Sequence, residues 1–300
     1  MVLRSAICEP LDYKLPDFKH LPGVSFLLHI TKDDARDKKI KNTEALSVFY
    51  LPNLQHLSAS IENPATFSWP TAQSPTPSKL ISLDLTKVRE EYLGELLSVT
   101  PNLKSLRWRW YYDFDIHDDL NTPIVDLDRM ATAISHVGGT LTELTIIGDC
   151  EIGATDYYAP PIKIEGSLNA MVNWGMLKKL QIPWAFLVGF AEDKSKRLQD
   201  LIPKNIEILS ITDDLKLQND DGMVSDWPIW DWEDRAMLGL LQSWLEDWKA
   251  CTPHLRRITL IICPEWIFHE FDEWTPDMRQ EFRELGARTG VEIEIIELDH

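Results

Sequence analysis

Apolar and polar positions alternate in a recurring short pattern, of which Leu103, Leu106 and Trp108 form the clearest copy. In this pattern two apolar residues lie three positions apart, and a third follows two positions later. Side chains of a β-strand alternate between its two faces, so the second and third apolar residues share one face. The first is expected in the entry turn, packed beneath them. The pattern therefore predicts a short strand with one buried face.

At least seven copies of the pattern follow one another along the chain. They are Leu54/Leu57/Ala59, Leu80/Leu83/Leu85, Leu103/Leu106/Trp108, Leu141/Leu144/Ile146, Leu177/Leu180/Ile182, Ile206/Leu209/Ile211 and Leu255/Ile258/Leu260. Several are entered through a phrase such as Pro52-Asn53-Leu54 or Pro101-Asn102-Leu103. The spacing between copies is irregular, which indicates a repeat array with long insertions. We also expect an opening strand over 24–30 and a closing strand through Val291, Ile293 and Ile295.

Helical patterns lie between the copies and after them. They predict helices over 42–50, 89–99, 127–137, 167–174, 190–202, 233–250 and 277–287. The last has Thr275 as its cap and Pro276 in its first turn, and Gly138-Gly139 is expected to close the helix over 127–137. Alternation of strand and helix predicts right-handed crossovers between adjacent parallel strands.

This order predicts one α/β domain over residues 1–300, a right-handed leucine-rich-repeat solenoid or horseshoe. The strands would line its concave face and the helices its convex face. Residues 1–50 would form an N-terminal cap region, 51–265 the irregular repeats, and 266–300 the C-terminal helix and closing strand. A solenoid grows by adding repeats, so this length does not require a second domain.

The Pro-Asn-Leu entries, the irregular insertions and the Trp-rich loops resemble the leucine-rich-repeat domains of F-box proteins, especially divergent fungal ones. In that family the repeats select a substrate, and an N-terminal F-box binds the adaptor of a ubiquitin ligase. An F-box opens with Leu-Pro and continues as amphipathic helices. Here Leu15-Pro16 is followed by Pro22-Gly23, which would break the first helix, so no F-box is recognisable. The resemblance thus implies the substrate-recognition role alone.

Composition narrows the classes of partner and compartment. A formal net charge of −18 argues against nucleic acid or an anionic membrane as partner, because both need clustered Lys and Arg. The first eight residues contain too short an apolar run for a signal peptide, and no run approaches a membrane span. The four cysteines, Cys8, Cys150, Cys251 and Cys263, are expected to be reduced thiols. We therefore expect an intracellular protein, cytoplasmic or nuclear.

Candidate catalytic and metal-binding groups are few. The acidic run from Asp113 to Asp119 lacks the Gly and Glu that an EF-hand calcium loop needs at its sixth and twelfth positions, and we interpret it as a solvated loop. The pairs Asp213/Asp214 and Asp220/Asp221 have no apparent apolar pocket, so we expect turn and helix-entry roles for them. No nucleotide-binding or nucleophile motif occurs. We expect no enzyme activity, no metal and no cofactor.

Candidate binding residues lie on the outward strand face and in three loops, 109–124, 212–234 and 263–276. In a parallel array these loops leave the sheet at one rim, and they are rich in aromatic and acidic residues. We expect about half of the rings to form a satellite core and the rest a recognition surface. The predicted binding residues are Arg107, Arg109, Trp110, Tyr112, Lys179, Trp227, Trp230, Trp232 and Arg257.

Three functions fit this sequence. The first is non-catalytic recognition of another protein, as in the substrate-recognition part of a ubiquitin-ligase-type assembly. The second is binding of a small molecule in a cleft framed by Arg107 and Arg109 on the sheet and the tryptophans at the rim. The third is an enzyme with an acidic, metal-dependent site near 113–119. The outward strand positions also fit a plain solvated sheet, since Ser and Thr suit a pleated surface.

Overall fold

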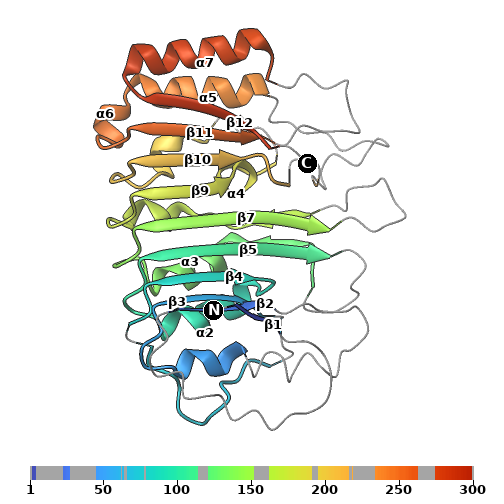
Figure 1. Ribbon diagram of the computed structural model, residues 1–300. Helices are drawn as coiled ribbons and strands as arrows, with labels where there is room; N and C mark the ends of the chain where they lie inside the picture. The colour runs from blue at the N-terminus through green and yellow to red at the C-terminus, as the bar shows by residue number, and fades with distance from the viewer. Residues whose placement is uncertain are drawn as a thin grey trace.

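A long parallel sheet forms the framework of this α/β protein, as a computed structural model shows (Figure 1). The structure describes residues 2–4, 23–27, 45–61, 63, 66–77, 79–113, 121–151, 162–190, 195–215, 218, 234–262 and 274–298. The strands in these ranges are β1 (Val2–Arg4), β2 (Gly23–Leu27), β3 (His56–Ser60), β4 (Ser82–Thr86), β5 (Ser105–Asp113), β6 (Ile124–Asp126), β7 (Glu143–Glu151), β8 (Lys163–Glu165), β9 (Lys179–Pro183), β10 (Ile208–Thr212), β11 (Arg257–Ile262) and β12 (Glu292–Glu297).

The main sheet contains ten of these strands, in the order β1-β2-β3-β4-β5-β7-β9-β10-β11-β12. All neighbouring strands in it are parallel. β6 and β8 form a separate parallel pair. The described sheet therefore follows chain order, with the excursions β6 and β8 left out of it.

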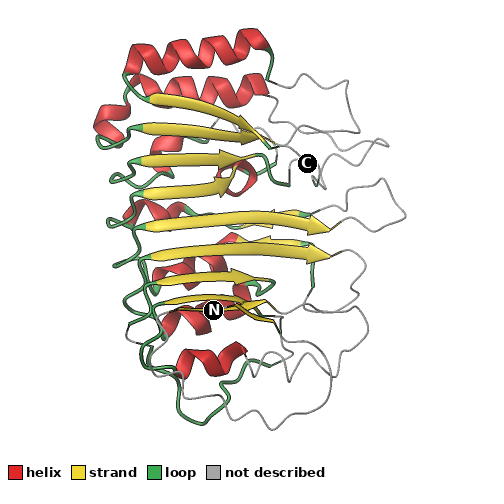
Figure 2. Cartoon of the chain, in the orientation of Figure 1, coloured by secondary structure: helices red, strands yellow, loops and turns green. Residues whose placement is uncertain are grey.

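The described helices cover one face of the sheet, and none of them covers the other, which we call the open face (Figure 2). They are η1 (Val48–Tyr50), α2 (Glu90–Ser98), α3 (Leu127–Ser135), η2 (Asn169–Asn173), α4 (Trp184–Val188), η3 (Leu198–Asp200), α5 (Asp234–Glu246), α6 (Trp248–Cys251) and α7 (Pro276–Thr289), where η denotes a 3₁₀-helix. α2 packs beside α3, and α5 packs beside α7. No helix in the described ranges is both long and apolar enough to cross a membrane.

The predicted apolar pattern forms the core between the sheet and the helices. Leu80, Leu83 and Leu85 are completely buried, and the equivalent residues of the other six copies are also buried. Neighbouring strands align these residues across the sheet, as in the register of Leu83 with Leu106 and of Leu106 with Leu144. The predicted strand positions and their buried faces are confirmed.

The strand entries share one backbone geometry. In most copies the N–H of the first apolar residue donates to the carbonyl three residues earlier, as Leu80 does to Pro77 and Leu103 to Thr100. Two consecutive N–H groups then donate to one carbonyl at the preceding strand entry. These acceptor carbonyls belong to Gln55, Ile81, Lys104, Thr142, Lys178 and Glu207. The same contact thus recurs from β4 to β11, whatever the length of the insertion between strands.

The boundaries of α7 agree with the predicted signals. The Thr275 hydroxyl accepts from the N–H of Met278, Pro276 is the first helical residue, and Gly290 ends the helix at a φ of +79°. Gly tolerates this left-handed conformation because it has no Cβ. α3 is capped by Asp126 and ends at Ser135, slightly before the predicted stop at Gly138-Gly139.

Several predicted elements are wrong or incomplete. The helix over 190–202 is not formed as predicted: α4 precedes it and ends at Gly189 with a φ of +83°, and among the described residues 190 and 195–202 only η3 is helical. The helix over 233–250 is divided at Asp247 into α5 and α6. The helix over 167–174 is the 3₁₀-helix η2. β1, β6 and β8 were not predicted.

Candidate functional site

β5 presents two chemically different faces. Arg107 is exposed, and Arg109 and Tyr111 are partly exposed, on the open face of the sheet. Trp108 and Trp110 on the opposite face are completely buried. β5 and its neighbour β7 are nine residues long, whereas β4 and β9 have five. Both long strands extend beyond their neighbours at the carboxyl end of the sheet (Figure 1).

Trp110 and Tyr112 belong to the core, so their predicted place in an exposed rim is wrong. The composition from residue 109 onward predicts a loop, but β5 continues to Asp113. Alternation along the strand therefore keeps directing the even-numbered residues inward. The Trp110 and Phe186 rings meet edge to face, with centroids 6.4 Å apart. This agrees with the expectation that part of the aromatic set forms core.

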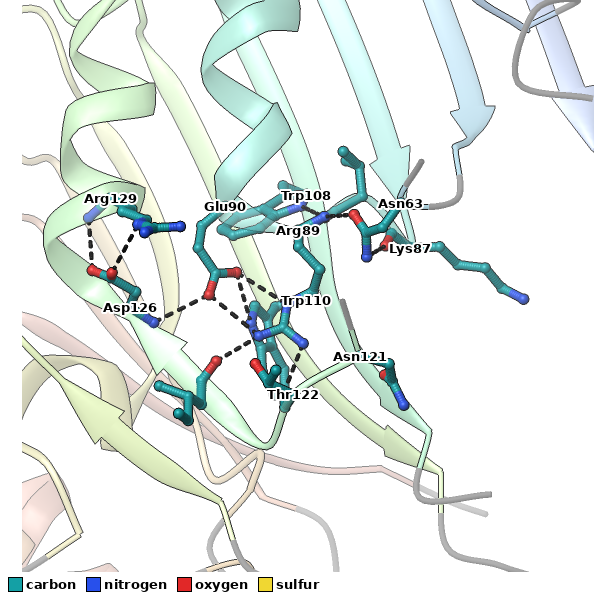
Figure 3. Close-up of polar contacts among 12 residues, drawn as sticks. Asn63, Lys87, Arg89, Glu90, Trp108, Trp110, Asn121, Thr122, Asp126 and Arg129 are labelled. Carbon is teal, nitrogen blue, oxygen red and sulfur yellow. Dashed lines mark hydrogen bonds and ion pairs between the residues drawn. The ribbon is translucent and has the colours of Figure 1, made fainter. Parts of the chain in front are cut away.

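A buried ion pair lies beneath β5 (Figure 3). The Arg89 guanidinium donates from Nε to Oε2 of Glu90 at 3.1 Å and from Nη2 to Oε1 at 3.2 Å. It also donates to the carbonyls of Thr122 and Ile124. Its Cζ lies 4.5 Å from the centroid of the Trp110 ring. The charge of Arg89 is thus compensated by a carboxylate, two carbonyls and an aromatic face.

Glu90 completes the same network. Its carboxylate accepts from Nε1 of Trp110 at 3.2 Å and from the N–H of Asp126 at 3.2 Å. Both side chains of the ion pair are buried, with 5% of the Arg89 side chain and 6% of the Glu90 side chain exposed. The backbone N–H of Arg89 donates to Oδ1 of Asn63 at 2.8 Å. The network therefore joins the start of α2 to β5 and to the β6 segment.

Cross-strand ion pairs occupy the open face. Arg109 pairs with Asp149 at 2.9 Å, and both side chains are more than a third exposed. Lys179 pairs with Glu143 at 2.6 Å. Arg257 pairs with Glu292 at 2.9 Å. Three of the four predicted basic residues thus have an acidic partner on an adjacent strand.

Arg107 differs from these three cations. It lies in register between Asp84 of β4 and Thr145 of β7. Within the part of the chain that the structure describes, its guanidinium has no hydrogen bond or ion pair. An exposed guanidinium can bind a carboxylate or phosphate by donating two parallel hydrogen bonds.

Aromatic and acidic groups adjoin Arg109 at the carboxyl end of β5. The Lys87 ammonium lies 5.3 Å from the centroid of the Tyr111 ring. The Tyr111 hydroxyl donates to Oδ2 of Asp113 at 3.1 Å. The backbone groups of Asp113 pair with the side-chain amide of Asn121. These contacts join the end of β5 to Asn121, where the described chain resumes.

Buried titratable groups lie beside the carboxyl end of β7. Burial, with added repulsion from Asp149 and Asp113, raises the pKa of the Cys150 thiol to about 12. Burial also raises the pKa of Asp214 to about 6. The expectation that no burial-shifted carboxyl would occur in the 213/214 pair is therefore wrong, although the predicted turn role holds. In the described ranges no group of three or more His, Cys, Asp or Glu could hold a metal ion.

Several of the remaining predicted residues lie where the structure gives no description. Trp227, Trp230 and Trp232 lie outside the described residues, as do 114–119 of the acidic run, Cys8 and Cys263. Cys150 and Cys251 are free thiols. A hollow of about 480 Å³ lies where α6 meets the end of α7, and it contains none of the predicted binding residues.

No protein-family model matches the chain, and no curated protein matches it.

Proposed function

We propose that this protein is a leucine-rich-repeat solenoid that binds another protein on the open face of its sheet. The recurring strand entry supports the repeat assignment. Six successive entries use the same pair of N–H donors and a single carbonyl acceptor, although the connections between them differ in length. A common backbone contact with variable connections is what a degenerate repeat array requires.

The observation that carries the binding proposal is the position of Arg107. It is exposed near the middle of the described sheet, on the face without described helices, and it has no polar partner among the described residues. Arg109, Lys179 and Arg257 on the same face are already paired. Arg is among the residues most enriched at binding hot spots.

The partner that fits this arrangement is a protein segment carrying an exposed carboxylate. The guanidinium would bind the carboxylate, and the partly exposed polar groups around it, such as Ser105 and Thr145, would bind backbone groups of the segment. Because the protein has a net charge of −18, long-range repulsion would disfavour a partner that is acidic as a whole. A single well-placed carboxylate is therefore favoured over a polyacidic segment. The resemblance of this chain to the leucine-rich-repeat domains of F-box proteins implies that the partner is a substrate brought to a ubiquitin-ligase-type assembly.

Selection of random peptides displayed against the purified protein tests this function. We expect the enriched peptides to share an Asp or Glu, and Arg107→Gln to weaken their binding by about ten-fold or more, as loss of a charged hydrogen bond predicts. Arg257→Gln is the matched control, because Arg257 already has Glu292 as its partner. Both variants should keep the melting temperature of the parent. Equal binding by the parent and Arg107→Gln would refute the proposed site.

A further inference from the structure

The turn after β10 reaches across the end of β9 to β7. β9 pairs with β7 only from Lys179 to Gln181, although it stays paired with β10 as far as Pro183, after which α4 begins. β7 continues to Glu151, so its edge beyond residue 145 lacks pairing with β9. There the N–H of Gly148 donates to Oδ2 of Asp214 at 3.0 Å. A side-chain carboxyl thus replaces the strand carbonyl that β9 does not supply.

Packing seats the same turn closely on β7. A Cβ added to Gly148 would lie 2.7 Å from Cγ and Cδ1 of Leu215, so only glycine leaves room for that leucine. Leu215 is buried and has a φ of +68°, a rare conformation for a residue with a side chain. The N–H of Gln218 donates to the carbonyl of Leu215 at 3.0 Å, and the carbonyl of Gln218 accepts from Ile162 at 2.6 Å. The turn therefore connects β7 to the segment that leads into β8.

The charges around Asp214 oppose its ionisation. Burial is the largest influence and raises its pKa, and Asp213 of the turn and Asp149 of β7 add repulsion. The hydrogen bond from Gly148 acts in the other direction but is outweighed, so the pKa of Asp214 is about 6. Arg109 of β5 binds Asp149 rather than Asp214. Cys150, next along β7, has a raised pKa and is neutral at physiological pH.

We propose that residues 213–215 form a pH-sensitive latch, which holds the end of β7 when the Asp214 carboxyl is protonated and loosens when that carboxyl ionises. The latch would act on the neighbourhood of the Arg109–Asp149 pair, because Asp149 follows Gly148 directly. It rests on the geometry of β7 and the turn, and it does not depend on the proposed binding function.

The direction of the effect follows from the two protonation equilibria. An Asp in the released turn has its ordinary pKa of 3.8, and in the latched state its pKa is about 6. Protons therefore bind the latched state more tightly, and latching is fully favoured below about pH 4. The advantage is lost progressively between about pH 4 and pH 6 and stays lost above that range. From these two pKa values, opening becomes about ten-fold more frequent between pH 5 and pH 8.

Hydrogen exchange of the Gly148 amide tests the latch in the full chain. After correction for intrinsic exchange rates, we expect its protection in the parent to fall about ten-fold from pH 5 to pH 8. Asp214→Asn retains a carbonyl acceptor but cannot ionise, so its protection should not change with pH. Asp213→Asn is the matched control, and it should keep the pH dependence with a slightly lower midpoint. Unchanging protection in the parent, or a pH response that persists in Asp214→Asn, would overturn the proposal.

A direct titration covers the case in which Asp214→Asn does not fold. The ¹³C chemical shift of the Asp214 carboxyl should titrate in the parent with a midpoint near 6, as its burial requires. A midpoint near the ordinary value for Asp would show that the turn is already open to solvent. That result would also overturn the latch.

Discussion

The charged side chains on the two faces of β5 differ in burial and in the number of their hydrogen-bond partners. Beneath the strand, Arg89 and Glu90 are almost fully buried, and together they use a carboxylate, an indole N–H, a backbone N–H and two carbonyls as partners. On the open face, Arg109 has one carboxylate partner and Arg107 has no described partner. Both regions contain arginine, but only the buried one is saturated with internal hydrogen bonds.

The difference shows which charges are available to a ligand. A buried charge without partners is costly, so folding must provide every partner from within the chain. An exposed charge is hydrated when unpaired, so the fold can leave it without a partner at little cost. We therefore assign the saturated Arg89–Glu90 network to stability, and our binding proposal concerns the open face around Arg107.

Adjacent residues on the two faces give the largest expected contrast. Leu106→Asp should unfold at least its own repeat and the neighbouring ones, because it places an unpaired carboxylate where a completely enclosed leucine packs. The loss should be about 5 kcal/mol or more, from leucine burial and charge burial together. Arg107→Asp, one position away, should cost about 1 kcal/mol or less, from repulsion by Asp84, with which it is in register. Urea unfolding followed by circular dichroism measures both. Equal losses in the two variants would show that the register of β5 is wrong.

The next largest effect concerns the buried ion pair. Arg89→Met removes the guanidinium and leaves the Glu90 carboxylate in the core with only the Trp110 and Asp126 N–H donors. Breaking one side of such a pair costs about 3–5 kcal/mol. The free energy of unfolding from urea titration at pH 7 is the appropriate measure.

A double variant shows how that cost arises. Arg89→Met combined with Glu90→Gln removes both charges, so it should lose less stability than the sum of the two single changes. Additive losses would mean that the two side chains do not act as a pair. Arg129→Met is a control on the same side of the sheet, because Arg129 forms an exposed pair with Asp126 and should matter little.

The sequence predicted the core strands well because their signal is local. Leu57, Leu83, Leu106 and Leu180 follow the apolar spacing, and all are buried in parallel strands. The length of β5 was missed because Arg109 and the aromatic run after it resembled a loop in composition. Strict alternation through Tyr112 was the signal available, with Trp108, Trp110 and Tyr112 on one side.

The buried networks could not be predicted, because their partners lie far apart in the chain. Arg89 meets Thr122 and Ile124, more than thirty positions away. Asp214 meets Gly148, which is 66 residues earlier. An adjacent Arg and Glu before an amphipathic helix usually indicate a solvated helix start. Only the fold brings β6 and Trp110 over them and makes the pair part of the core.

The smallest expected effect concerns Arg109 and sharpens the contrast with Arg89. Both arginines pair with a carboxylate, but Arg109 and Asp149 are 39% and 36% exposed at their side chains. Water solvates either partner when the other is removed, so Arg109→Met should cost less than about 1 kcal/mol. The pair should also weaken with salt, so the difference from the parent should shrink between low and high ionic strength. Urea unfolding at both salt concentrations measures this difference. A salt-independent loss of unfolding free energy near that of Arg89→Met would mean that the open face is part of the core. That result would contradict the proposal that Arg107 is a binding residue.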